Sequence, residues 1–154
     1  MSNTNIFTTN SSKQTQKLGE ILAKELKGGE IICLSGELGS GKTTFAQGVL
    51  KGLGAKGPYT SPTFVVMKEY KLKAKSEKRK ATAQNSKLEN VYHIDAYRVN
   101  AQDVLALGWE EIVASKNNIV IVEWAEKIKS IVPKDAVWMK FEHVKNDERE
   151  ITIN

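Results

Sequence analysis

Residues 31–44 read Ile-Ile-Cys-Leu-Ser-Gly-Glu-Leu-Gly-Ser-Gly-Lys-Thr-Thr, and this stretch decides the fold class. The apolar run at 31–34 is typical of a buried strand, and the residues from Lys42 onward are compatible with a helix. Between them lies the pattern Gly-x-x-x-x-Gly-Lys-Thr, which marks a phosphate-binding loop when it stands in this context. A glycine-rich turn that precedes Lys and Thr by chance is the plainer alternative, and the two flanking elements favour the loop.

The residue types in this loop suit an anionic ligand. Gly36, Gly39 and Gly41 let the backbone turn its N–H groups inward, where a Cβ atom would block the dihedral angles or the approach of a phosphate. The helix that begins near Lys42 directs the positive end of its dipole at the same anion. Lys42 can reach the terminal phosphates, and the Thr43 hydroxyl can ligate Mg²⁺. The sequence therefore predicts that a nucleoside triphosphate binds here.

The composition indicates one globular domain over residues 1–154. A chain of this length can bury a core without disulfides, and its hydrophobic and charged fractions, 40% and 27%, are in globular proportion. There is no long apolar run and no basic-then-apolar start, so we expect neither a membrane span nor a signal peptide. Cys33, the only cysteine, is expected to be a small buried side chain. Because no disulfide can form within the chain, a reducing cytoplasm fits best.

The positive charge is concentrated in one segment. Residues 71–87 contain seven Lys or Arg against Glu77 alone, a local charge of +6, so the rest of a chain with net charge +5 is near −1. Residues 72–90 also lack periodicity and are rich in Lys, Ala, Ser and Gln, so we expect an extended excursion or a disordered loop. The excursion is either a solvated charged segment or a contact for RNA or an acidic partner. The basicity is therefore not that of a nucleic-acid-binding domain as a whole.

A second informative stretch, Val-Tyr-His-Ile-Asp-Ala-Tyr-Arg, occupies residues 91–98. It starts as a strand, and the period of two places His93, Asp95 and Tyr97 on one side for as long as the strand lasts. An acidic residue at a strand end near a phosphate-binding loop can hold a water bound to Mg²⁺ or orient the attacking water. Asp95 is therefore a candidate for this role, and a surface pair between Asp95 and Arg98 is the alternative.

A third informative stretch, Ile-Val-Ile-Val-Glu-Trp, occupies residues 119–124. Four β-branched residues without alternation indicate a strand buried on both faces, as central parallel strands are. Glu123 follows at the carboxyl edge of the sheet, where the phosphate-binding loop also opens. This is the Walker-B position with Glu in place of the more frequent Asp, so a Mg²⁺ ligand is preferred over a capping role. Trp124 either shapes the partner or nucleotide surface or covers the core.

Other segments have the patterns of ordinary helices and strands. We expect a short strand or arm at 1–10 with Ile6 and Phe7 as its only anchors, and a helix from Ser11 or Ser12 to about residue 27. The remaining expected elements are a helix at 42–53, a strand at 64–70, a helical segment at 101–112, a short helix from 125 that Pro133 closes, and strands at 136–144 and 149–153 joined by a turn at 145–147.

Three more polar residues have roles that the pattern leaves open. Ser61 and Thr63 flank Pro62, which holds this loop extended because the residue before a proline is pushed out of helical space. The two hydroxyls are either ordinary turn residues or parts of a mobile loop that senses the γ-phosphate and Mg²⁺. Arg149, at the start of the last expected strand, is either a surface side chain or a contact to the base or ribose of a nucleotide.

Taken together, four stretches resemble the TsaE family, formerly YjeE, of small bacterial ATPases that work in forming threonylcarbamoyladenosine in tRNA. The residues that carry the resemblance are the loop at 36–44, Ser-Pro-Thr-Phe at 61–64, His-Ile-Asp-Ala-Tyr-Arg at 93–98 and Val-Glu-Trp at 122–124. The combination is more specific than the loop alone, and it covers nearly the whole chain. The sequence departs from relatives at 72–90, where they usually turn quickly.

The resemblance implies a single P-loop NTPase domain of the α/β class, with a mixed, mostly parallel sheet flanked by helices. It implies ATP as the nucleotide, Mg²⁺ held by Thr43 and Glu123, and Lys42, Asp95 and Glu123 as the catalytic residues. The implied nucleotide-binding residues are Thr15 near adenine, Glu37, Leu38, Gly39, Ser40, Gly41, Lys42, Thr43, Thr44 and Arg149. The implied switch or partner residues are Ser61, Thr63, His93, Tyr97, Arg98 and Trp124. TsaB and TsaD are the implied partners, and tRNA is reached through their complex.

Three functions remain possible at this stage. The first is an ATPase that drives its partners, because the phosphate machinery is present without a visible domain for an acceptor substrate. The second is a small-molecule kinase, which would need a lid with arginines over the transferred phosphate. The third is a non-hydrolytic adaptor in which ATP fixes a binding surface. GTP is less expected, because the base-reading sequence Asn-Lys-x-Asp does not occur.

Overall fold

The computed structural model describes residues 3–72 and 87–154. Most of the basic excursion expected at 72–90 lies outside these residues. The strands are β1 (Asn5–Thr9), β2 (Ile31–Gly36), β3 (Met67–Lys71), β4 (Asn90–Asp95), β5 (Asn118–Glu123), β6 (Val137–Lys145) and β7 (Glu148–Ile153). The helices are α1 (Ser12–Ala23), α2 (Lys42–Gly52), α3 (Ala101–Leu105), α4 (Trp109–Ala114) and the 3₁₀-helix η2 (Ala125–Ile131).

The seven strands form one mixed sheet in the order β1-β7-β6-β2-β5-β4-β3. The centre is parallel, since β2 pairs in parallel with both β5 and β6, and β5 pairs in parallel with β4. The edges are antiparallel, with β3 on β4 at one side and β7 between β6 and β1 at the other. The expected α/β class with a mixed sheet and a parallel centre is therefore confirmed.

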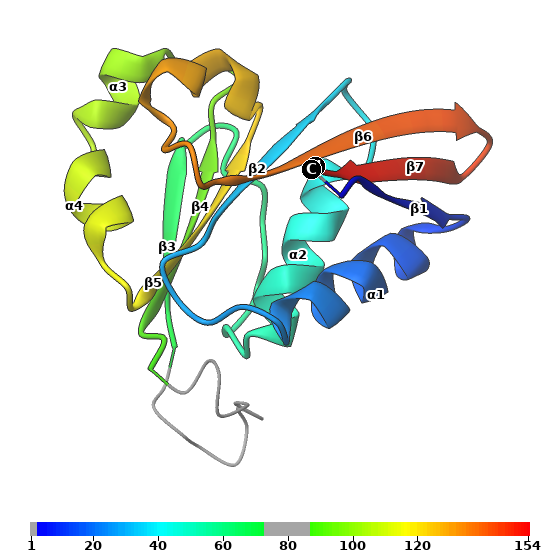
Figure 1. Ribbon diagram of the computed structural model, residues 1–154, viewed down its shortest axis with the longest axis horizontal. Coiled ribbons are helices and arrows are strands. Elements are labelled where there is room, and N and C mark those ends of the chain that lie inside the picture. The colour runs from blue at the N-terminus through cyan, green and yellow to red at the C-terminus, as the bar shows by residue number, and fades with distance from the viewer. Residues whose placement is uncertain (1–2, 73–86) are drawn as a thin grey trace.

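Helices cover both faces of the sheet (Figure 1). Helices α1 and α2 lie on one face, and their apolar side chains pack with Ile32, Ile121 and Phe141 of the strands. Helices α3 and α4 and the 3₁₀-helix η2 lie on the other face, where Trp109 packs against strand residues such as Val122. All six residues of β5 are buried, which confirms the expectation of a central strand with two covered faces.

Helices α1 and α2 pack unusually closely because glycines face each other at their contact. A Cβ atom on Gly48 would lie 2.0 Å from the carbonyl oxygen of Gln16, and one on Gly19 would lie 2.4 Å from that of Phe45. Only glycine therefore permits this backbone-to-backbone approach. The packing holds the first turn of α1 beside the loop before α2, where the Thr15 methyl would lie 3.5 Å from a Cβ on Gly41.

Several expected boundaries are wrong. Helix α1 ends at Ala23 rather than near residue 27, because the next backbone hydrogen bonds span three residues in place of four. Strand β3 begins at Met67 rather than Phe64, because the chain turns over 62–66 and Val66 takes a positive φ of 69°. The expected helix at 101–112 is two short helices, separated where Gly108 takes a φ of 90°.

The expected anchors of the amino-terminal strand are also wrong. Strand β1 exists, but Ile6 and Phe7 are 62% and 39% exposed. Its buried side chain is Thr9, and its backbone is held by pairing with β7. A two-residue alternation does not say which face of an edge strand is covered, so an apolar pair alone is a poor guide there.

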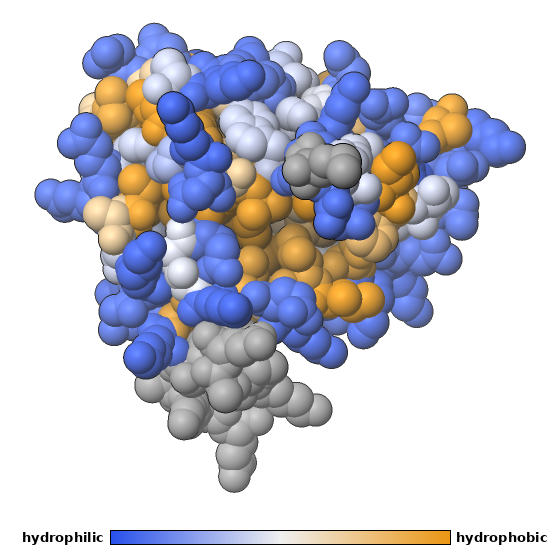
Figure 2. All heavy atoms as spheres, viewed as in Figure 1, coloured by the Kyte–Doolittle hydropathy of each residue, from blue (hydrophilic) through white to orange (hydrophobic). Residues whose placement is uncertain are grey.

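One face of the molecule has an apolar middle and a hydrophilic margin. Viewed from the side of Figure 1, apolar residues gather across the middle of this face and hydrophilic residues surround them (Figure 2). Within residues 3–72 and 87–154, no helix is both long and apolar enough to cross a membrane.

Candidate functional site

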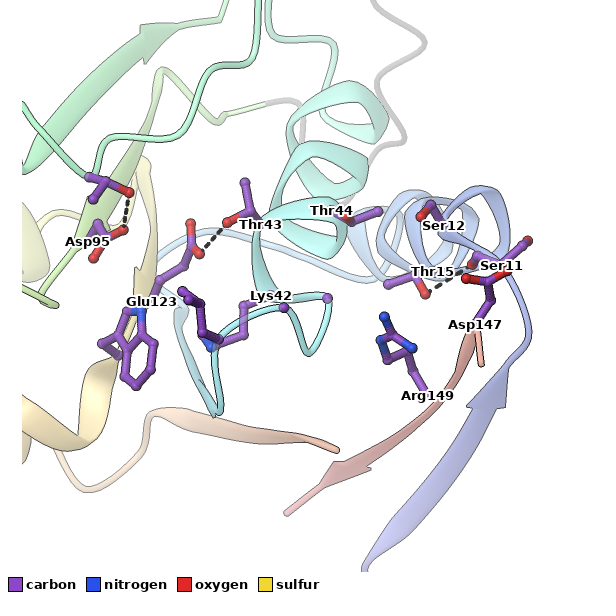
Figure 3. Close-up of a pocket in the computed structure, with 15 residues that line it drawn as sticks. Ser11, Ser12, Thr15, Lys42, Thr43, Thr44, Asp95, Glu123, Asp147 and Arg149 are labelled. Atoms are coloured by element: carbon purple, nitrogen blue, oxygen red, sulfur yellow. Dashed lines mark hydrogen bonds between the residues drawn. The ribbon is translucent and has the colours of Figure 1, made fainter. Parts of the chain in front are cut away.

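A cavity of about 240 Å³ lies where the parallel strands β2, β4 and β5 end. We call one side of it the strand end, formed by Lys42, Thr43, Asp95 and Glu123, and the opposite side the hairpin end, formed by Ser11, Ser12, Thr15, Asp147 and Arg149 (Figure 3). The other lining residues are Leu38, Gly39, Gly41, Thr44, Thr63 and Trp124. The loop between β2 and α2 therefore forms part of the cavity wall through Leu38, Gly39 and Gly41.

Glycine is required where this loop leaves the strand and where it enters the helix. Gly36 has a φ of 140°, and a Cβ atom there would lie 2.4 Å from the carbonyl oxygen of Phe141 on β6. Gly41 is the N-cap of α2 with a φ of 106°, and no side chain of the described residues caps the first turn. The first N–H groups of α2 are therefore open toward the cavity, as an anion-binding helix terminus requires.

Lys42 is a buried cation at the centre of the site. Its side chain is 4% exposed, and Nζ donates to the carbonyl oxygens of Gly36 at 2.5 Å and Glu37 at 2.9 Å. The same Nζ lies 4.1 Å from the centre of the Trp124 ring. Burial lowers the pKa of the Lys42 ammonium below its ordinary value, and the carboxylates of Glu123, Glu126, Asp95 and Glu37 oppose that shift. An anion in the cavity would stabilise the charged form of Lys42.

Glu123 joins two of the predicted site residues. Its side chain is almost completely buried at the end of β5. Thr43 Oγ1 donates to Glu123 Oε1 at 2.6 Å, and His93 Nε2 lies 2.6 Å from Glu123 Oε2. The two residues that the sequence pairs as metal ligands therefore lie in direct contact, although they are 80 positions apart.

Asp95 ends the neighbouring strand and organises the loop at 61–66. Its Oδ2 accepts a hydrogen bond from Thr63 Oγ1 at 2.9 Å, and Thr63 is in turn 2.7 Å from the Ser61 hydroxyl. Its Oδ1 accepts from the backbone N–H of Tyr97, and its own N–H donates to Val66. The sequence left open an ion pair between Asp95 and Arg98, and the structure shows no such pair within the described residues. Asp95 instead connects the loop at 61–66 to the end of β4.

Apolar and aromatic residues stand exposed around the strand end. Phe64 is 83% and Leu38 80% exposed, and Val65 and Tyr97 are 58% and 43% exposed. The Arg98 guanidinium lies 5.0 Å from the centre of the Phe64 ring. Tyr97 follows the end of β4, so its ring does not continue the strand alternation, and it packs against Trp124 at 4.9 Å between ring centres.

The hairpin end is built from segments near both termini of the chain. Thr15 is buried on the first turn of α1, and its hydroxyl lies 2.7 Å from that of Thr9 on β1. Arg149 comes from β7, where Nη1 donates to the carbonyl oxygens of Asn146 and Glu148. In Figure 3 the Arg149 side chain reaches toward Thr15, while Asp147 lies beside the start of α1.

The structure thus brings most of the predicted residues to one cavity. Those that do not line it are Glu37, Ser40, Ser61, His93, Tyr97 and Arg98. The Glu37 carbonyl oxygen and the Ser40 hydroxyl accept hydrogen bonds from Lys42 Nζ. The Ser61 hydroxyl is hydrogen-bonded to that of Thr63. His93 is 0% exposed, so its grouping with partner-facing residues is corrected: the side chain points inward to Glu123.

Sequence reasoning missed three lining residues: Ser11, Ser12 and Asp147. The sequence pattern places the two serines only at the start of a helix, and Ser11 is indeed the N-cap of α1. It places Asp147 only in a turn. The position of Asp147 two residues before Arg149 is the signal that could have found it, because residues of one tight hairpin lie close together.

Fold and site define the class: a mixed α/β domain with a glycine-rich loop between a central strand and a helix, and with an acidic residue at the end of the adjacent strand. The family model described as "Threonylcarbamoyl adenosine biosynthesis protein TsaE" matches residues 9–151. The chain belongs to the TsaE family, whose members take part in the biosynthesis of threonylcarbamoyladenosine in tRNA.

Individual relatives agree with this membership. A tRNA threonylcarbamoyladenosine biosynthesis protein TsaE from Rickettsia conorii is 33% identical over 96% of this chain and 77% of its own length. The Bacillus subtilis protein of the same name is 32% identical over 94% of this chain and 82% of its own length. The crystal structure of Bacillus subtilis YdiB superimposes with a TM-score of 0.72 at 28% identity, covering 99% of this chain and 86% of that one.

Proposed function

We propose that this protein is a Mg²⁺-dependent ATPase that drives TsaB and TsaD type partners through the tRNA threonylcarbamoyladenosine reaction. One observation carries the proposal: a buried lysine and a contacting threonine and glutamate meet at the mouth of a glycine-rich loop. The loop supplies backbone donors, Lys42 supplies a charge, and Thr43 with Glu123 supplies hard oxygens. These groups are the ones that phosphoryl transfer to water needs.

The donor set fits Mg²⁺. Mg²⁺ prefers oxygen ligands in octahedral geometry and usually keeps several waters, with one or two protein ligands and the nucleotide phosphates. The Thr43 hydroxyl and the Glu123 carboxylate are such ligands, and they already lie 2.6 Å apart. When bound there, the ion neutralises charge that develops on the phosphate oxygens.

The chain's own residues divide the remaining tasks. Lys42 leaves the loop carbonyls that it now contacts and holds the terminal phosphates instead. Asp95 orients the attacking water and is itself oriented by Thr63 and by the N–H of Tyr97. Trp124, beside Lys42, keeps bulk water away from that charge. At the hairpin end, Thr15 and Arg149 line the cavity and would hold the adenosine part of the ligand.

The exposed side chains around the strand end favour a partner-driven enzyme. Leu38 lines the cavity, and Phe64 and Val65 directly follow Thr63, which also lines it; we call these three exposed apolar side chains the apolar rim. Apolar side chains gathered on a surface are typical of sites that bind another protein. A partner that covers the rim would also press on the loop that holds Asp95, so its binding and ATP hydrolysis would be coupled. Because tRNA modification is the pathway, we place the protein in the cytoplasm.

The test is ATP hydrolysis by the protein alone and again with purified TsaB and TsaD from the same source. We expect weak hydrolysis alone, a large rise with the partners, and loss of the rise in Glu123→Gln. Glu110→Gln, on the exposed side of α4, is the matched carboxylate control. Absence of any rise while ATP binds tightly would refute the proposal. Repeated product formation with a slowly hydrolysed ATP analogue would favour the adaptor, and phosphorylation of a metabolite would favour the kinase.

The apolar rim has its own test. Replacing Phe64 and Val65 together by Ser should lower the partner-stimulated rate and leave the rate of the isolated protein unchanged. Leu107→Ser, at a 40% exposed position between α3 and α4, is the control for exposing a serine in place of a hydrophobic residue. Equal stimulation of all three proteins would show that the partners dock elsewhere.

A further inference from the structure

His93 has no task in the mechanism above, yet it is the most deeply buried polar residue near the site. It lies on β4, two residues before Asp95, and its side chain is 0% exposed. In the parallel pairing of β4 with β5, Asp95 stands opposite Glu123 and His93 opposite Ile121. The imidazole therefore reaches diagonally along the same face of the sheet to the Glu123 carboxylate.

The two carboxylate oxygens of Glu123 have different partners. Oε2 is 2.6 Å from His93 Nε2, and Oε1 accepts the Thr43 hydroxyl at 2.6 Å. Thr43 and Glu123 line the cavity and His93 does not, so the His93 contact is on the far side of the carboxylate. A hydrogen bond to one oxygen of the carboxylate restrains rotation about the Cγ–Cδ bond, so it favours one direction for the other oxygen.

The other ring nitrogen makes no competing polar contact within the described residues. Nδ1 is buried and has no hydrogen-bond partner in that part of the chain. A buried histidine whose role is only to stabilise the fold normally satisfies both nitrogens, since an unpaired buried polar atom destabilises the folded state. Here the one polar contact of the ring goes to the predicted metal ligand.

We infer that His93 is a positioning residue that fixes Glu123, so that this carboxylate offers Oε1 alone to Mg²⁺ in the cavity. This inference rests on the proposed function, because it takes Glu123 as a Mg²⁺ ligand. Outer-shell hydrogen bonds of this kind orient a metal ligand, and their removal weakens metal affinity or activity by about 10- to 100-fold.

The first test is spectroscopic and leaves His93 itself unchanged. The chain has two histidines, His93 and His143, so a His143→Gln variant assigns their ¹⁵N signals in a long-range ¹H–¹⁵N spectrum. We expect His93 to carry its proton on Nε2, with a strongly deshielded proton that shifts in Glu123→Gln. A proton on Nδ1 alone, or a His93 signal that Glu123→Gln leaves unchanged, would overturn the inference.

The second test distinguishes the loss of the hydrogen-bond donor at Nε2 from the loss of the imidazole ring. The Gln side-chain amide can reach the place of Nε2, whereas Leu removes the donor. ATP affinity is measured by calorimetry in EDTA and over a series of Mg²⁺ concentrations. We expect His93→Leu to raise, by about 10- to 100-fold, the Mg²⁺ concentration at which half of the Mg²⁺-dependent gain in ATP affinity is reached. Its ATP affinity in EDTA should be unchanged. His93→Gln should bring the required Mg²⁺ concentration most of the way back to the wild-type value.

A purely structural role predicts a different result, in which both variants lose affinity in EDTA and in Mg²⁺ alike. That result would overturn the inference, as would a His93→Leu protein with the wild-type Mg²⁺ response. If His93→Leu does not fold, His93→Asn replaces it, because the shorter amide falls at the place of Nδ1 and cannot reach Glu123. Glu123→Gln with an unchanged Mg²⁺ response would instead show that the proposed function has failed.

Discussion

The strand end and the hairpin end of the cavity are built on opposite principles. At the strand end, Lys42, Asp95 and Glu123 are each less than 5% exposed, and every one of them is held by other parts of the site. At the hairpin end, Asp147 stands exposed in a turn, and Arg149 donates to the carbonyl oxygens of that same turn. The strand end is a connected buried network, whereas the hairpin end combines this exposed turn with one buried hydroxyl pair, Thr15 and Thr9.

The difference follows from where each end sits in the sheet. The strand end is formed by strands of the parallel centre, whose flanks are covered by helices on both faces. The hairpin end is formed by the antiparallel edge, where β1 pairs with β7 and Thr9 lies opposite Arg149. Preorganised charge is what accelerates a reaction, whereas an adaptable surface suffices to bind a base. We therefore expect the strand end to govern turnover and the hairpin end to govern affinity.

The largest effect is expected from a change at the strand end. Lys42→Met keeps a side chain of similar length and removes the charge, so the rate of partner-stimulated ATP hydrolysis should fall by about a hundredfold or more. Steady-state hydrolysis with TsaB and TsaD measures it. The control is Lys51→Met in the last turn of the same helix, where the ammonium makes an exposed contact with Glu20 and does not line the cavity. Similar rates of hydrolysis for the two variants would contradict the expectation that the strand end governs turnover.

The next largest effect is expected from the hydroxyl pair that connects Thr15 at the hairpin end to Thr9 on β1. Thr15→Val leaves the buried Thr9 hydroxyl without its partner, so the free energy of unfolding should fall by about 1–3 kcal/mol. Urea denaturation measures this change. Adding Thr9→Val removes both hydroxyls and should recover part of the loss, because two apolar groups can pack where one unpaired hydroxyl cannot. Additive losses in the double variant would show that the hydroxyl pair does not join β1 to α1.

A smaller effect is expected from Arg149→Ala. If Arg149 only assists binding, the dissociation constant of ATP should rise about fivefold, which corresponds to one hydrogen bond of about 1 kcal/mol, while the partner-stimulated rate at saturating ATP stays the same. Calorimetry and steady-state kinetics measure the two quantities. Lys140→Ala, an exposed cation of β6 outside the cavity, is the control. A fall in the saturated rate would place Arg149 with the strand-end residues.

The smallest effect should come from Cys33, on β2 beneath the strand end. Burial raises the pKa of its thiol from 9.0 to about 12, so the folded protein keeps it neutral while the unfolded chain ionises above pH 9. Ionisation therefore favours the unfolded chain, and the contribution of this thiol to stability declines as the pH rises from about 9 toward 12. At pH 8 a thiol reagent should not label the native protein and should label it fully in urea. Rapid native labelling would mean that the parallel centre opens readily.

Local patterns predicted the strand end well. The glycine spacing, the run of four β-branched residues and the acidic residues at two strand ends are each contained in a few consecutive positions. Parallel strands bring their carboxyl ends to one edge of the sheet, so these patterns alone place Lys42, Thr43 and Glu123 together. The predicted boundaries were wrong where contacts with residues distant in the chain determine the structure. An example is the start of β3, where the chain turns over 62–66 to reach Asp95.

By itself, the sequence determined the fold class, the loop and the residue types that would meet a phosphate, because these depend on backbone dihedral angles and on periodicity. Only the tertiary structure decided that the first turn of α1 and the β6–β7 turn close the other end of the cavity, and that His93 turns inward to Glu123. Both depend on contacts between residues far apart in the chain. A period of two tells which residues share a face, and only packing tells what that face meets.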